Sequence, residues 1–390
     1  MKYKFFYKIL VITLILLILI SFFPLYGFAL TTKSNEDVYD IILFIGQSNM
    51  VGSSRNYAET RYSRRSYEKD NIFTPGQYAS LTQIKSFILR NNGKSLNFVS
   101  VKQKPNTVFE YMYLTNNFKE IDSTIKQNYG ENLVYRNGTL VDYNQTDKSH
   151  ISLAASSGTN MIPQFCKTYS EITGHKVIAV CAGKRGVPIE AFLPHDDNRN
   201  IRYKDCYVYE AIQTKFSAAV NLAEKNNLKI GQKFYVIAQG ENDVTAKTTK
   251  DDYKSMYKTL HNKLKSQLGI KMGALVETST TPGTKTMKEI NQVHQAQEEL
   301  INQNSDIILG SSYFYDRYVS TRADYKNCNT QVTISWNGKK SDYDEAYTRA
   351  TYSRDPSINK DGKHNLNHYT SAALCKVGMD AATSLSSYVK

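Results

Sequence analysis

Four clusters of residues have the types needed for nucleophilic catalysis. Ser48 stands in the turn Gly-Gln-Ser-Asn-Met at 46–50, directly after an apolar run. A glycine-containing turn at 181–188 could point a bare backbone N–H into a cleft, and 239–243 offers an amide and two carboxylates. Residues 361–368 add two histidines. A serine, a histidine base and donors for a developing oxyanion are the parts of a serine hydrolase.

Each cluster also has an ordinary structural interpretation. Serine is a favoured helix N-cap, so Ser48 could simply begin the next helix. A glycine turn after a strand is common, the carboxylates at 241 and 243 could cap a helix, and a histidine at a helix start is usually a surface residue. Only their order along the chain favours a shared site.

Apolar runs predict the elements that position these clusters. Buried parallel strands are expected directly before Gly46 and then at 176–181, 233–238, 272–276 and 306–310. Apolar residues at helical spacing predict helices over 212–222, 253–264, 290–301 and about 370–386. Strands alternating with helices predict an α/β fold with a parallel sheet. Its carboxyl edge, where such sheets bind ligands, would gather the clusters.

Two stretches interrupt this alternation within a single domain at 38–390. The first, about 53–149, is polar and rich in Tyr and Asn, and we expect short helices at 84–90 and 109–117 within it. The second, about 327–354, contains a hairpin signal around Asn337-Gly338. Both are interpreted as insertions that shape the substrate site.

The N-terminal segment predicts export. Residues 1–29 combine lysines, an apolar run and Gly27-Phe28-Ala29, a pattern typical of a cleaved signal peptide. An uncleaved membrane anchor is the alternative, and it would be the chain's only membrane contact. The protein is therefore expected to be secreted or attached to the cell surface.

Composition argues against several function classes. The formal charge of +13 comes from scattered Lys and Arg rather than from a basic stripe, which argues against nucleic-acid binding. The 5 cysteines are few and odd in number, so disulfides do not organise the fold. No zinc-ligand spacing, P-loop or dinucleotide fingerprint is present, and we expect neither metal nor cofactor. The oligomeric state is not indicated.

A serine, a glycine and an asparagine at the ends of three successive strands, followed by a histidine near the C-terminus, form an order that resembles the SGNH hydrolase superfamily. The turn Gly46-Gln47-Ser48-Asn49-Met50 is similar to the first block of the sialate O-acetylesterases and plant-type acetylxylan esterases, a carbohydrate esterase family 6-like branch. The run 239–243 is similar to the third block of that branch, and the run 188–194 is similar to the stretch after its second-block glycine. The resemblance spans most of the chain outside the two insertions.

This resemblance implies a fold, a site and a reaction. The fold would be a three-layer α/β/α sandwich of flavodoxin-like type. Ser48 would be the nucleophile, and its N–H together with Gly186 and Asn242 would form the oxyanion hole. The substrate would be an acetylated carbohydrate. Residues expected to contact substrate or support the site are Gln47, Gln239 and Glu241.

The start of the last predicted helix allows two registers for the base. The family places Asp three residues before its histidine and a helix-packing glycine ten residues after it. His368 has Gly378 at the later distance but Asn365 in place of the aspartate. The alternative base, His364, has Asp361 three residues before it, as the family does. This register requires four extra residues between the histidine and the helix. We prefer His368, oriented by Asn365 or Asp361, or acting in a Ser-His dyad.

Three functions fit these observations. The leading hypothesis is a secreted serine esterase that removes O-acetyl groups from sialic acid, xylan, or cell-wall or mucin glycans through an acetyl-serine intermediate. An SGNH esterase or lipase acting on other acyl esters is the enzymatic alternative. A catalytically silent glycan-binding protein is the third, and the asparagine at position 365 is its only support.

Overall fold

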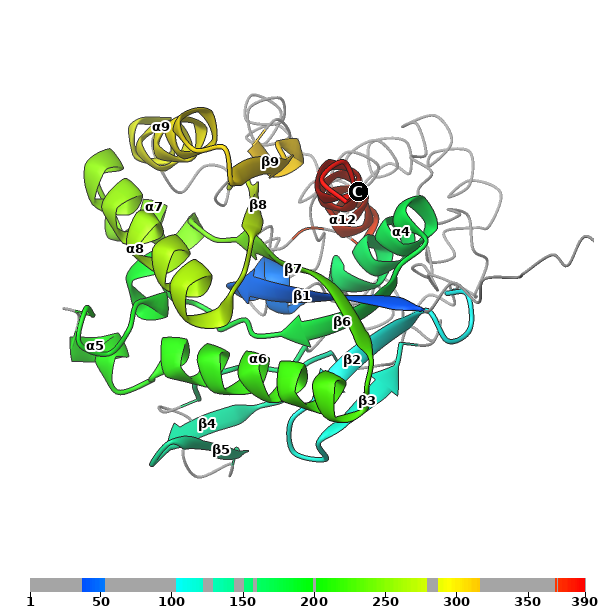
Figure 1. Cartoon of the computed structure of the whole chain (residues 1–390). Helices are drawn as coiled ribbons and strands as arrows, with labels where there is room; N and C mark the ends of the chain where they lie inside the picture. The colour runs from blue at the N-terminus through cyan, green and yellow to red at the C-terminus, as the bar shows by residue number, and fades with distance from the viewer. Residues whose placement is uncertain are drawn as a thin grey trace, which may run out of the picture. The chain divides into compact units, whose positions relative to one another are not determined.

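A seven-stranded sheet forms the centre of the molecule. The computed structural model describes residues 37–52, 103–121, 129–143, 151–156, 160–198, 201–278, 287–315, 369 and 371–389. The strand order is β3-β2-β6-β1-β7-β8-β9 (Figure 1). All neighbours pair in parallel except β3, which pairs antiparallel with β2. The strands are β1 (Val38–Gly46), β2 (Val108–Met112), β3 (Asn117–Glu120), β6 (Lys176–Cys181), β7 (Lys229–Ala238), β8 (Met272–Val276) and β9 (Ile307–Ser311).

The five strands predicted from apolar runs are confirmed as the core of this sheet. In space they run β6-β1-β7-β8-β9, which in chain order is 2-1-3-4-5, the flavodoxin-like arrangement. From β1 the chain passes to β2 and β6 on one side of it, and after β6 it crosses to β7 on the other side. In this arrangement the crevice beyond the carboxyl ends of β1 and β7 is the topological switch point, where such folds bind ligands.

Helices cover both faces of the sheet, which gives the expected α/β/α layering (Figure 1). Side chains alternate along β1, so Ile41 and Leu43 join one apolar core while Ile42 and Phe44 join the other. The first core is closed by α6 (Val208–Lys225), α8 (Lys250–Leu268) and α9 (Met287–Gln303), and the second by α4 (Ile162–Thr173) and α12 (Ser371–Ser386). This double coverage explains why the central strands are continuously apolar.

Part of the first predicted insertion joins the main sheet. We predicted a helix at 109–117, and this prediction is wrong, because β2 and β3 occupy that stretch. Val, Phe, Tyr and Met in β2 fit a half-buried strand, and Asn116 takes a positive φ of 44° in the turn that follows. Local turn chemistry and pairing with β6 therefore override the helical spacing.

A second hairpin from the same insertion packs on α6. It consists of β4 (Leu133–Arg136) and β5 (Thr139–Asp142). Beside it, the buried Lys215 of α6 forms an ion pair with Glu131 at 2.9 Å. The predicted helix at 84–90, the second insertion at 327–354 and the N-terminal segment 1–29 lie outside the described residues.

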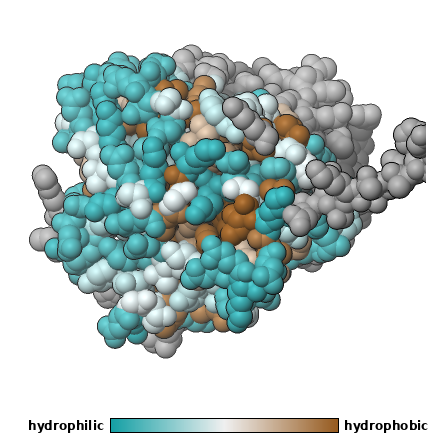
Figure 2. All heavy atoms as spheres, in the orientation of Figure 1, coloured by the Kyte–Doolittle hydropathy of each residue, from teal (hydrophilic) through white to brown (hydrophobic). Residues whose placement is uncertain are grey.

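The surface in the orientation of Figure 1 is largely hydrophilic. Figure 2 shows one hydrophobic patch near the centre of this face, between the two helix layers. No helix in the described part of the chain combines the length and apolarity of a membrane span. The described cysteines, Cys166, Cys181, Cys206 and Cys375, are buried and form no disulfide with one another.

Candidate active site

Ser48 lies at the first position of a short helix directly beyond β1. The strand ends at Gly46, whose φ of 146° suits glycine, and a Cβ there would overlap the Ala238 carbonyl oxygen of β7. Helix α2 (Ser48–Val51) follows, and its N-cap is Gln47 without a side-chain capping bond. Ser48 therefore does not serve as the N-cap of this helix. Its partly exposed side chain stands at the carboxyl edge of the sheet, at the switch point.

The two neighbours of Ser48 in the sequence are fastened to the turn after β7. Asn49 Nδ2 donates to Glu241 Oε1 at 2.6 Å, and Gln47 Nε2 donates to Glu241 Oε2. Glu241 opens α7 (Glu241–Ala246) and so belongs to the predicted third cluster. Its carboxylate clamps the serine turn from both sides, and this Glu241 clamp brings together clusters that lie nearly 200 residues apart (194 and 192 positions).

Burial raises the pKa of the Glu241 carboxyl above its usual value, while the hydrogen bonds from Asn49 and Gln47 act to lower it. Two amide donors on one carboxylate favour its charged form. Because both carboxylate oxygens are occupied by these donors, Glu241 is suited to position Ser48 rather than to accept a proton from it.

Gly186 and Asn242, two of the predicted oxyanion donors, lie against each other. A Cβ built on Gly186 would lie 3.9 Å from Asn242 Nδ2, with no other atom closer. Gly186 is exposed with φ 69°, and Asn242 is partly exposed. Gly186 and the Asn242 amide are thus neighbours at the sheet edge, as two donors to one oxyanion would have to be. Asn242 directly follows Glu241, so both belong to the same turn.

Asp243 is a buried carboxylate whose positioning role the sequence did not show. Asp243 Oδ2 accepts the N–H of Ile189 at 2.9 Å and Nε2 of Gln239 at 3.1 Å. Gln239 Nε2 also donates to the Val187 carbonyl oxygen at 2.8 Å. Gln239 is buried, so it supports the loop that carries Gly186 and does not face a substrate. The four-residue spacing between Gln239 and Asp243 was the available signal.

Burial dominates the electrostatics of Asp243. It raises the pKa of this carboxyl to about 7, although hydrogen bonds from Ile189, Gln239 and Thr248 work in the opposite direction. Because this carboxyl titrates near neutrality inside the fold, it makes the stability of the folded protein depend on pH.

Tyr369 connects the C-terminal part of the chain to the serine turn. Its backbone N–H donates to Asn49 Oδ1 at 3.4 Å, and its hydroxyl donates to the Phe314 carbonyl oxygen at 3.0 Å. Its ring stacks on that of Phe314 with 3.8 Å between centroids. No local sequence pattern marks Tyr369 as such an anchor. The predicted base and acid positions, His368, His364, Asn365 and Asp361, lie outside the described residues.

Within the described ranges, no three His, Cys, Asp or Glu side chains gather in a way that could hold a metal ion. The residues that do gather are Ser48, the amide side chains of Gln47, Asn49 and Asn242, the clamping carboxylate of Glu241, and Gly186. This set can hold an oxyanion and orient a nucleophile.

Comparison with known proteins gives only distant structural likenesses. No family model and no curated protein matches the chain. A protein of Arabidopsis thaliana superposes with a TM-score of 0.43 at 11% identity, covering 90% of this chain and 99% of that one. NanS superposes with a TM-score of 0.37 at 12% identity, covering 90% and 98%.

A carbohydrate acetylesterase from Xanthomonas citri superposes with a TM-score of 0.34 at 12% identity, over 70% of this chain and 49% of that one. These TM-scores are too low for the likeness to carry a functional assignment. A functional proposal must therefore rest on the strand order and on the contacts described above.

Proposed function

We propose that this protein is a serine esterase that removes O-acetyl groups from carbohydrates. The observation that carries the proposal is the Glu241 clamp. It holds the Ser48 turn against the turn that presents Asn242, and Asn242 in turn lies beside Gly186. A partly exposed serine, backed by converging donors at the topological switch point, suits attack on an ester carbonyl.

The reaction would proceed through an acetyl-serine. Ser48 Oγ attacks the acetyl carbonyl carbon while His368 takes the hydroxyl proton. The oxyanion is held by the N–H groups of Ser48 and Gly186 and by Asn242 Nδ2. On collapse, the C–O bond to the sugar breaks and the histidine returns the proton to the sugar oxygen. Water, deprotonated by the same histidine, then releases acetate and regenerates Ser48.

Two contacts support His368 rather than His364 as the base. Tyr369, the next residue after His368, is bonded to Asn49, and consecutive Cα atoms are only about 3.8 Å apart. Gly378, ten residues after His368, allows α12 to pack closely on α4, since a Cβ there would overlap the Met161 carbonyl oxygen. The matching position for His364 holds Leu374, whose side chain could not fit such a contact.

Two assays test the proposal. Wild-type protein should hydrolyse p-nitrophenyl acetate, and Ser48→Ala should not. Failure of wild type to release acetate from this ester or from any acetylated glycan would favour the silent glycan-binding protein. Hydrolysis of p-nitrophenyl octanoate as fast as the acetate would favour an esterase for longer acyl chains.

The register is tested separately by two matched variants. His368→Ala should abolish ester hydrolysis and His364→Ala should preserve it. The reverse pattern would move the base to His364 and the acid to Asp361. An additional loss with Asn365→Ala or with Asp361→Ala would identify the group that orients the base.

We also propose that residues 1–29 direct export and are removed. Expression of the full chain in a secreting host should yield protein in the medium whose N-terminus begins after Ala29. Protein retained in the membrane with an intact N-terminus would instead indicate an anchor.

A further inference from the structure

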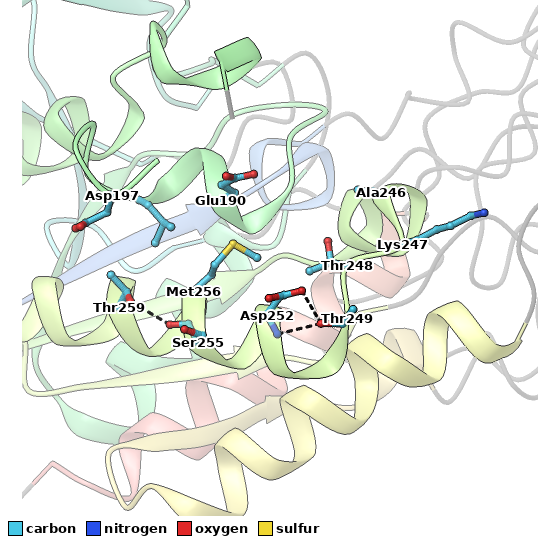
Figure 3. A pocket seen from close by; sticks show the side chains of 11 residues that line it. Glu190, Asp197, Ala246, Lys247, Thr248, Thr249, Asp252, Ser255, Met256 and Thr259 are labelled. Atoms are coloured by element: carbon cyan, nitrogen blue, oxygen red, sulfur yellow. Dashed lines mark hydrogen bonds between the residues drawn. The ribbon is translucent and has the colours of Figure 1, made fainter. Parts of the chain in front are cut away.

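A groove with a volume of about 570 Å³ lies beside η3 (Ile189–Phe192) and the start of α8 (Figure 3). Glu190 and Asp197 lie on one side of it, and Asp252, Ser255 and Met256 of α8 lie on the other. Small-molecule sites have volumes of roughly 300–1,000 Å³. The groove is therefore large enough for a sugar ring.

The lining is rich in groups that bond to hydroxyls. Besides its carboxylates it carries the hydroxyls of Thr248, Thr249, Ser255 and Thr259. Carboxylates accept hydrogen bonds from sugar hydroxyls, and side-chain hydroxyls both donate and accept them. Met256 and Leu193 add apolar surface, against which the C–H face of a sugar ring can pack. This mixture fits a polyhydroxylated ring better than an acyl chain.

The charge of the lining is negative. Glu190, Asp197 and Asp252 contribute carboxylates, of which Asp197 pairs with Lys263 at 3.7 Å. Lys247 is the only basic side chain among the lining residues. In Figure 3 the Lys247 side chain points away from the groove. A ring bearing its own carboxylate would be repelled by like charges here. The groove thus favours sugars without an acidic group.

The groove is built onto the same elements as the candidate oxyanion donors. Asp243, the neighbour of Asn242, accepts the N–H of Ile189 at the start of η3, and its other oxygen accepts the hydroxyl of the lining residue Thr248 at 3.2 Å. Glu190 is four residues after Gly186, a stretch that spans at most about 14 Å. A short oligosaccharide can therefore reach from one to the other.

We propose that this groove binds a neutral sugar ring of the acetylated glycan, away from the ring that carries the acetyl group, and excludes rings with a carboxylate. The placement of the acetylated ring at Ser48 rests on the proposed function, whereas sugar binding in the groove does not. Xylan-type or other neutral chains then become the expected substrates, ahead of sialic acid or uronic acid chains.

The first test is binding of unacetylated probes. Titration calorimetry of the wild-type protein with xylohexaose, cellohexaose and hexagalacturonate should show that at least one neutral probe binds about tenfold or more tightly than hexagalacturonate. Equal or tighter binding of hexagalacturonate would overturn the proposal. So would the absence of binding by both neutral probes at about 10 mM, a concentration that fills even weak, millimolar sites.

Three variants locate the binding. Ser255→Trp, at an exposed position, should fill the groove and weaken neutral-probe binding about tenfold or more. Asp251→Asn, in the first turn of α8 beside Asp252 but outside the lining, is the matched control for removal of a carboxylate and should change nothing. The double variant Glu190→Gln with Asp252→Asn should reduce the difference in binding affinity between hexagalacturonate and the neutral probes. An unchanged affinity in Ser255→Trp would place the binding elsewhere.

These results separate the two proposals. Unacetylated probes need no reaction at Ser48, so their binding succeeds or fails independently of p-nitrophenyl acetate hydrolysis. Binding in the groove without ester hydrolysis would leave the sugar site standing and overturn the esterase. Ester hydrolysis without binding of the probes in the groove would support the esterase and overturn the sugar site.

Discussion

Strand β1 has a cluster of catalytic residue types at each end. At its amino end, the buried Asp40 accepts hydrogen bonds from Tyr169 at 2.7 Å and from His175 Nδ1 at 2.9 Å. At its carboxyl end lie Ser48 and the Glu241 clamp. Asp40 and His175 have the geometry of a catalytic Asp-His pair, yet six residues of strand, about 20 Å, separate Asp40 from Gly46.

The difference between the ends teaches that place in the fold matters more than residue type. The carboxylate of Asp40 also accepts the N–H of Gln232. Burial of Tyr169 raises the pKa of its hydroxyl, and the neighbouring Asp40 carboxylate raises that pKa further. These bonds satisfy buried groups where β1, β7 and α4 meet. At the carboxyl end, by contrast, the donors Gly186 and Asn242 stay accessible. The amino-end cluster therefore stabilises the fold, and the carboxyl-end cluster can bind substrate.

The largest expected effect distinguishes the two ends directly. Ser48→Ala should lower turnover of p-nitrophenyl acetate by roughly 10⁴-fold or more, because the nucleophile is lost. Its melting temperature should stay close to that of wild type. His175→Ala should instead retain turnover per folded molecule and lower the melting temperature. Steady-state kinetics and thermal denaturation of both variants check this. Loss of activity in a folded His175→Ala protein would contradict the purely structural role of the amino-end cluster.

The next effect concerns the oxyanion donors. Asn242→Ala should reduce kcat by about 10²–10³-fold, the usual cost of one such donor, with little change in KM. Asn242→Asp keeps the shape but replaces the donor with an acceptor, and it should be at least as damaging. If both variants kept wild-type kcat, Asn242 would have no role in holding the oxyanion.

A smaller effect is expected at the Glu241 clamp. Glu241→Gln keeps the volume but weakens the bonds from Gln47 and Asn49, so Ser48 loses its fixed position. We expect kcat to fall by roughly 10- to 100-fold, because small misplacements of reacting groups carry costs of this order. Gln47→Glu should have a comparable effect, since it sets two carboxylates against each other. A rise in KM alone would assign Glu241 to substrate binding instead.

The last effect concerns stability rather than catalysis, and it is a dependence of the free energy of unfolding on pH. The Asp243 carboxyl has a pKa of about 7 in the folded protein against an ordinary value of 3.8, so the folded state holds a proton that the unfolded state releases in that range. The free energy of unfolding should therefore fall as pH rises from about 4 to 7, by up to about 1.4 kcal/mol per pH unit. Asp243→Asn should flatten this slope in urea titrations, and an unchanged slope would contradict it.

The central fold follows from local sequence patterns. The apolar runs of the inner strands are bounded by polar residues and buried on both faces, so strand positions such as 176–181 and 272–276 match the structure. The stretch 109–117 was predicted wrongly because aromatic residues at helical spacing also fit a strand, and pairing with β6 decides between the two.

The candidate site was only partly predictable. Gly186 and Asn242 could be proposed because each follows a strand that ends at the same edge. Other contacts of the site join residues far apart in the chain, and no local sequence pattern predicts them. They are the hydrogen bonds of Glu241 with Gln47 and Asn49 and that of Tyr369 with Asn49. The groove beside η3 depends on how α8 packs there, which the sequence does not show.

The most direct test of the account is to trap the acetyl-enzyme. Wild-type protein mixed with p-nitrophenyl acetate and quenched in acid within milliseconds should carry an acetyl group on the peptide that contains Ser48, as peptide mass spectrometry would show. The Ser48→Ala protein should carry none there. Rapid ester turnover by wild type with the acetyl group on another residue, or with undiminished turnover in Ser48→Ala, would contradict the account.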